Sequence, residues 1–178
     1  DLSVLYPEFL QDSSVLVARE HPEAEHIRAS LKAVLEGPNP DYETAEGLMA
    51  LSFAYLGHAV RDETEFECLL EARQTNLLGG PEYVLTLPDG GRVLPFREGV
   101  DRALGTDLTV RGASEKLMQD VPVLVETWQW KQRARGHTFS GANILYWDGR
   151  VAWVPLGTFP VVPPVMDVLC GLAQETAR

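Results

Sequence analysis

The chain has 178 residues, of which 45% are hydrophobic, 23% charged and 8% aromatic, a composition typical of an ordinary globular domain. Its net charge of -11 argues against binding to nucleic acid or to an anionic membrane, because both need a positive protein surface. The longest apolar stretch, 47–57, has the length of a buried helix and is too short for a membrane span. We therefore expect one domain, 1–178, with neither of these partners.

The acidic residues are concentrated in the N-terminal half. Residues 1–89 carry 17 acidic and 5 basic side chains, whereas residues 90–178 carry 9 and 10. This excess predicts a face for a basic partner, although acidic surfaces most often serve solubility alone.

The two cysteines, Cys68 and Cys170, fit neither a CxxC pair nor a zinc pattern. We expect both to be reduced core residues in a cytoplasmic protein, with a long-range disulfide as the alternative. Arginine makes up 12 of the 15 basic residues, which we interpret as the mark of a GC-rich bacterial gene. The first residues lack the basic start and apolar core of a signal peptide, but the chain does not begin with Met, so a removed export signal stays open.

Several segments have the periodicity of helices. Apolar residues form one stripe of the segment 22–36, which ends at Gly37-Pro38 and is predicted to be an amphipathic helix. The segment 44–61, which Thr44 can cap, is apolar almost all round and is predicted to be a buried central helix. Short helices are expected near 98–104 and 113–119, and a final helix at 165–176.

Alternation of apolar and polar residues predicts strands in two places. Over 65–71, apolar residues alternate with glutamates, and this favours a half-exposed strand over a continuing helix. The segment 121–132 is predicted to be one long strand, and one of its faces carries Leu124, Trp128 and Trp130.

Glycine-containing turns predict two hairpins. Segments 83–87 and 92–96 flank Pro88-Asp89-Gly90-Gly91, and segments 143–147 and 150–154 flank Asp148-Gly149. A two-residue type I′ turn at Asp148-Gly149 places Tyr146 opposite Val151 and Ile144 opposite Trp153. One face would then be a core surface formed by Ile144, Tyr146, Val151 and Trp153. The order of elements predicts an α+β fold, with a mainly antiparallel sheet of hairpins packed on the central helix and with N- and C-terminal helices.

Residues suited to catalysis are few. There is no GxSxG elbow and no phosphate-binding loop, and the acidic clusters match neither an HExxH motif nor a calcium loop, so we expect no metal and no cofactor. On the predicted central helix, His58 lies one turn before Asp62, whose carboxylate can orient the imidazole and raise its pKa. A small-ligand binder or hydrolase-like enzyme that uses this pair, or His137 with Arg135, is the alternative function.

The leading hypothesis is a non-enzymatic, cytoplasmic, macromolecule-binding protein of bacterial type, such as an immunity protein, a chaperone or an adaptor. Its acidic half would face a basic protein partner through Glu63, Glu65 and Glu67. The only locally basic stretch combines aromatic and cationic side chains, which are enriched at interfaces; its residues are Trp128, Trp130, Arg133 and Arg135. A homo-oligomer joined through edge strands of the Trp-rich sheet is the structural alternative.

Overall fold

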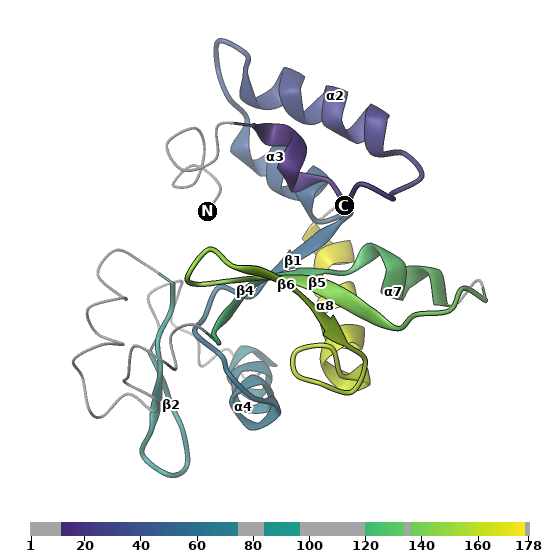
Figure 1. Cartoon of the computed structure of the whole chain (residues 1–178). Coiled ribbons are helices and arrows are strands. Elements are labelled where there is room, and N and C mark those ends of the chain that lie inside the picture. Colours follow the sequence, from purple (N-terminus) through teal and green to yellow (C-terminus); the bar gives the residue numbers. More distant parts are fainter. Residues whose placement is uncertain (1–11, 75–83, 97–119, 134–135, 177–178) are drawn as a thin grey trace. The chain divides into compact units, whose positions relative to one another are not determined.

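The computed structural model describes residues 12–74, 84–96, 120–133 and 136–176 (Figure 1). Two compact units divide the chain: unit 1 comprises Asp1–Ala54, Glu126–Ser140 and Met166–Arg178, and unit 2 comprises Tyr55–Val125 and Gly141–Val165. Both helices and antiparallel sheets are present, so the α+β class is confirmed. The expectation of a single domain stays a prediction, and the helices expected at 98–104 and 113–119 lie outside the described residues.

The N-terminal part of unit 1 consists of η1 (Ser13–Leu16), α2 (Ala24–Leu35) and α3 (Tyr42–Met49). The amphipathic helix predicted from the sequence is confirmed as α2. Its buried stripe contacts α3 and η1 and consists of Ala24, Ile27, Leu31 and Leu35. The spacing of these residues by three and four positions is what lets one face of α2 leave water while the other stays solvated.

The predicted central helix 44–61 is wrong in its second half. Asp41, and not Thr44, caps α3, because its carboxylate accepts hydrogen bonds from the backbone N–H of Thr44 at 3.1 Å and from its hydroxyl at 2.7 Å. The helix ends at Met49, and Phe53–Tyr55 forms strand β1. A continuous apolar run does not distinguish a buried helix from a strand, and Gly57, with φ +72°, ends the regular segment.

Strands β1, β4 (Pro122–Glu126), β5 (Gly141–Tyr146) and β6 (Val151–Pro155) form a four-stranded sheet in the order β1-β4-β5-β6 (Figure 1). The pairs β4–β5 and β5–β6 are antiparallel. Two backbone hydrogen bonds at the ends of β1 show that β1 and β4 also run antiparallel: Thr127 N–H donates to Ser52 O at 2.9 Å, and Leu56 N–H donates to Val123 O at 3.1 Å. The mainly antiparallel sheet is therefore confirmed.

The long strand predicted at 121–132 is right only as far as Glu126. From Trp128 to Gln132 the chain forms the short helix α7 instead. Trp130 is buried and Trp128 is half-buried, so the alternation of the two tryptophans does not place them together on a sheet face. Five residues are too few for an apolar period to separate the two structures.

The strand favoured at 65–71 is also wrong, because Glu63–Gln74 forms helix α4. Asp62 accepts a hydrogen bond from the backbone N–H of Glu65 at 2.9 Å, the geometry of a helix N-cap. The buried residues then follow helical spacing: Glu65, Phe66, Leu69 and Ala72. The glutamates that suggested alternation occupy more than one face of this helix.

The remaining described elements are two short strands and the last helix. Strands β2 (Leu85–Thr86) and β3 (Arg92–Val93) form an antiparallel pair, and α4 contacts β2. The predicted final helix is confirmed as α8 (Pro163–Thr176), which begins two residues earlier than expected. Proline is well suited to the first turn of a helix, where its missing N–H costs nothing.

Both hairpins turn through a three-residue loop that ends in a left-handed glycine. In the larger one, Gly149 N–H donates to Tyr146 O at 3.0 Å and Tyr146 N–H donates to Arg150 O at 2.9 Å. Gly149 has φ +81°. Leu145 therefore pairs with Val151, and Asn143 with Trp153, one residue away from the predicted register. A slip of one residue moves every side chain of a strand to the opposite face.

Candidate functional site

The exposed side of α4 is acidic. Glu63, Glu67 and Glu71 are exposed and recur every four residues, so they form one stripe, which we call the α4 acidic stripe. The side chains of Glu63 and Glu67 make no hydrogen bond or ion pair with the described part of the chain. The sequence-predicted Glu63 and Glu67 are thus brought together on a surface, and Glu71 is a member that the strand interpretation missed.

Glu65 is not part of this surface, which corrects the predicted set. Its side chain is 0% exposed and pairs with Arg61. The carboxylate accepts hydrogen bonds from the backbone N–H of Arg61 at 2.9 Å and from Nε at 3.3 Å, and it also accepts one from a terminal guanidinium nitrogen. A buried pair of this kind holds the start of α4, and removing one partner would leave an uncompensated buried charge.

The α4 acidic stripe acts on a neighbouring thiol. Burial raises the pKa of Cys68 above its ordinary value, and the negative charges of Glu71 and Glu67 raise it further. Cys68 is half-buried and free, as is the buried Cys170. The expectation of reduced thiols agrees with these free cysteines, whereas the expectation that both lie in the core is right only for Cys170.

The proposed pair of His58 and Asp62 loses its geometric basis, because His58 is not on a helix. It is 5% exposed and forms an isolated antiparallel bridge with Pro95. Asp62 sits at the start of α4, where its carboxylate caps the helix through Glu65 N–H. The spacing of four residues therefore does not bring the two side chains onto one helical face.

The predicted aromatic and basic stretch divides between core and surface. Trp130 is buried, donates from Nε1 to Asp167 at 2.9 Å, and packs edge-on against Phe139 with ring centroids 5.0 Å apart. The Arg133 guanidinium lies 4.1 Å from the centroid of the Trp130 ring. This stacking holds Arg133 on the protein surface by a cation–π contact. Arg135 lies outside the described residues, and His137 is exposed.

Trp128 is bonded to a buried carboxylate. Its Nε1 donates to Glu126 at 2.9 Å, and Glu126 is buried. The rings of Trp128 and His21 lie 5.7 Å apart. Burial lowers the pKa of His21, with Glu23 opposing the shift and Lys131 adding to it. This set holds α7 against the chain before α2, and no catalytic step follows from it.

Lys131 has a structural partner. Its Nζ donates to Ala50 O at 3.1 Å, and Ala50 is the C-cap of α3, where exposed carbonyls and the helix dipole favour a cation. Burial lowers the pKa of Lys131 and raises the pKa of Cys170 to about 11. A thiol with so high a pKa is a poor nucleophile at neutral pH.

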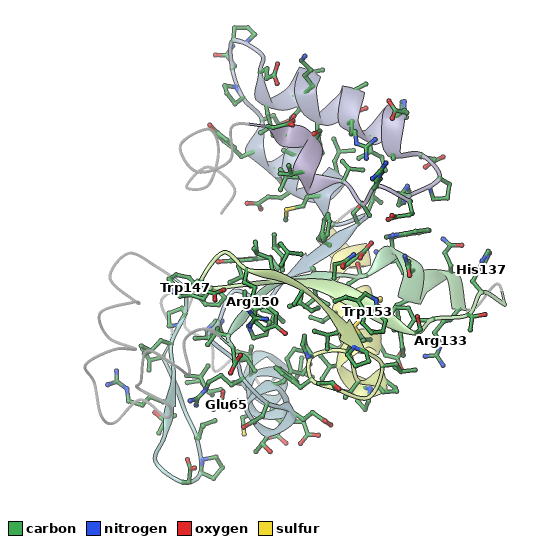
Figure 2. All side chains as sticks on the ribbon, viewed as in Figure 1. Glu65, Arg133, His137, Trp147, Arg150 and Trp153 are labelled. Atoms are coloured by element: carbon green, nitrogen blue, oxygen red, sulfur yellow. The ribbon has the colours of Figure 1, made fainter. Side chains whose placement is uncertain are left out.

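The outer strand β6 exposes large apolar side chains. Val151 is 65% exposed, Trp153 55% and Leu156, directly after the strand, 40%; we call these residues the β6 apolar strip. Figure 2 labels Trp153 on β6, apart from Trp147 and Arg150 at the hairpin turn. The sequence interpretation placed Val151 and Trp153 in the core, because it assumed a two-residue turn. A three-residue loop ending in glycine was the signal that could have found this surface.

Comparisons of the chain with protein-family models, with curated proteins and with solved structures give no match. In the described ranges no helix is long and apolar enough to cross a membrane. Within the same residues no group of three His, Cys, Asp or Glu side chains is arranged to hold a metal ion.

Proposed function

We propose that the protein is a non-enzymatic, cytoplasmic binding protein of bacterial type, and that the α4 acidic stripe receives a basic protein partner. The observation that carries the proposal is the exposure of Glu63, Glu67 and Glu71 along one face of α4. Roles of this kind include those of an immunity protein, a chaperone and an adaptor.

The energetics of α4 support this assignment. Like charges four residues apart destabilise a helix by about 0.2–0.5 kcal/mol per pair. Arg61, two residues before Glu63 in the sequence, pairs with the buried Glu65. A basic partner would place positive charges beside these glutamates, and the acidic field would speed its association.

The enzyme alternative has weaker support. It assumed that His58 and Asp62 lie on one helix. In the structure α4 begins only at Glu63, and His58 forms an isolated bridge with Pro95. Its other version uses Arg135, which lies outside the described residues, with His137. No contact of the described His137 favours that version over partner binding.

The test is an affinity capture from lysate of the source organism with the full chain as bait, at low and high salt. The variant carries Glu63→Gln, Glu67→Gln and Glu71→Gln. The control carries Glu20→Gln, Glu23→Gln and Glu43→Gln, which are exposed glutamates outside α4 and change the net charge by the same amount.

We expect a basic protein to be retained by the wild-type chain and the control, lost with the α4 variant, and released at about 0.5 M salt, where screening is strong. Equal retention by both variants, or capture only of proteins that salt does not release, would contradict the proposal.

A further inference from the structure

The outer edge of β6, which pairs with no other strand in the described part of the chain, has the hydrogen-bonding pattern of a strand that accepts another strand. In the order β1-β4-β5-β6, β6 is the last strand. Tyr146 N–H bonds to Arg150 O, so by the alternation of antiparallel ladders Ala152 and Val154 also point their backbone groups toward β5. Val151 and Trp153 then point their N–H and C=O groups away from the sheet.

The same edge lacks the usual protection against pairing. Edge strands are commonly guarded by charged side chains or by proline at an outward N–H. The strand Val151–Pro155 carries no charged residue, and its only proline, Pro155, comes last. The indole of Trp153 lies against the backbone of Gly141, where even a Cβ atom would be 2.5 Å from the ring, so this side chain is held in place before any partner arrives.

Charge selects the occupant of this edge. A basic peptide finds no carboxylate on the strand Val151–Pro155, and an acidic peptide finds no cation there. Arg150, which precedes the strip, is paired with Asp148 at 3.8 Å and with Asp120 at 3.4 Å. A second copy of this chain would bring its own uncharged β6 strand to this uncharged strand.

We propose that two copies of the chain pair antiparallel through β6, about a two-fold axis at Ala152. In this register Val151 of each copy lies opposite Trp153 of the other, and the two residues exchange both of their outward hydrogen bonds. The two Ala152 residues face each other at a non-hydrogen-bonded position, where strands approach most closely and a small side chain fits. Each Val151–Trp153 pair is of the β-branched and aromatic type that stabilises sheets.

The first test is sedimentation equilibrium of the full chain from about 1 μM to about 500 μM, a range that detects weak dimers. The variant is Val151→Lys, and the matched control is Val15→Lys, because Val15 is 55% exposed and lies in η1. In the proposed register the two new lysines are diagonal neighbours about 7–8 Å apart and the contact with Trp153 is lost.

We expect a concentration-dependent dimer for the wild-type chain and the control. For Val151→Lys we expect the dissociation constant of the dimer to be at least about tenfold higher. A monomer at every concentration, or an unchanged dimer in Val151→Lys, would overturn the proposal. The α4 acidic stripe is intact in both variants, so capture of a basic partner by Val151→Lys would leave the proposed function standing whatever happens to the dimer.

The second test fixes the register. Ala152→Cys places two thiols across the axis at a spacing that a disulfide can bridge. Mild oxidation should give a covalent dimer of this variant, whereas the wild-type chain, which contains only Cys68 and Cys170, should stay monomeric under denaturing conditions. Failure of Ala152→Cys to cross-link in a sample that sediments as a dimer would exclude this axis.

Discussion

The two hairpins of unit 2 use the same turn but differ in what surrounds them. In each, two backbone hydrogen bonds close an Xaa-Asp-Gly loop. In the shorter hairpin Leu87 N–H donates to Gly91 O at 2.8 Å and Gly90 N–H donates to Leu87 O at 3.0 Å; the corresponding bonds at Tyr146 are 2.9 and 3.0 Å long. The Asp side chain accepts from the residue after the glycine at 2.9 Å in both. Yet β2–β3 pairs two residues on each strand, whereas β5–β6 pairs five.

The difference between the hairpins separates local from long-range causes. The loop sets the register in both, because it fixes which residues close the turn. The extent of pairing depends on neighbours: β5 also pairs with β4, and its buried Ile144 anchors the ladder. One consequence is that the longer hairpin carries Val151 and Trp153 on an exposed face.

The largest effect is expected at the far end of the longer hairpin, at Gly141. A Cβ atom there would lie 2.4 Å from Val154 O and 2.5 Å from the Trp153 ring. We expect Gly141→Ala to lower the free energy of unfolding by about 2–4 kcal/mol, measured by urea denaturation.

The matched substitution is Gly171→Ala, in helix α8, where nothing lies within 4 Å of the new atom. It should be neutral or stabilise the protein by up to about 1 kcal/mol. Equal effects of the two substitutions would show that Trp153 does not lie against the β5 backbone.

An intermediate effect is expected at the two loop glycines. Gly90 and Gly149 have φ values of +82° and +81°, and a Cβ atom added at either would meet nothing within 4 Å, so strain and not collision sets the cost. We expect Gly90→Ala and Gly149→Ala each to cost about 1–2 kcal/mol in urea denaturation. Asn at either position should cost less, because Asn tolerates this conformation. If the substitution left the free energy of unfolding unchanged at one loop only, the two turns would not be equivalent.

The smallest effect concerns Tyr146, which has no counterpart in the shorter hairpin. Burial raises its pKa, and the Arg150 cation, 4.0 Å from the ring centroid, opposes that shift. Arg150→Gln should therefore raise the pKa further, as read from phenolate absorbance. Because the folded pKa lies above the unfolded one, the contribution of Tyr146 to stability is complete below about pH 10 and is lost as pH rises through the folded pKa. A lower pKa in Arg150→Gln would contradict the placement of the cation.

The sequence predicted the features that depend on local chemistry. The apolar stripe of α2, the positions of the two Asp-Gly turns and the final helix were identified, although the turn at Asp148-Gly149 has a three-residue loop and α8 begins at Pro163. Each rests on a spacing or a turn residue with a direct physical meaning.

The errors fall where tertiary contacts decide. The strand β1 forms from an apolar run because β4 pairs with it, and the segment 65–71 becomes helical around the cap at Asp62 and the buried Glu65. Neither partner is visible in the local pattern. For the candidate site, the sequence identified Glu63 and Glu67. It missed the β6 apolar strip, because the predicted pairing of β5 with β6 was wrong by one residue.

The register of β5–β6 decides which side chains the longer hairpin exposes, and proton–proton distances across the hairpin test it directly. In a nuclear Overhauser experiment on the labelled chain, the structure predicts strong contacts between the Hα protons of Leu145 and Val151, and of Asn143 and Trp153, because these pairs occupy the close, non-hydrogen-bonded positions. Strong contacts between Tyr146 and Val151, and between Ile144 and Trp153, would restore the two-residue turn and return Trp153 to the core.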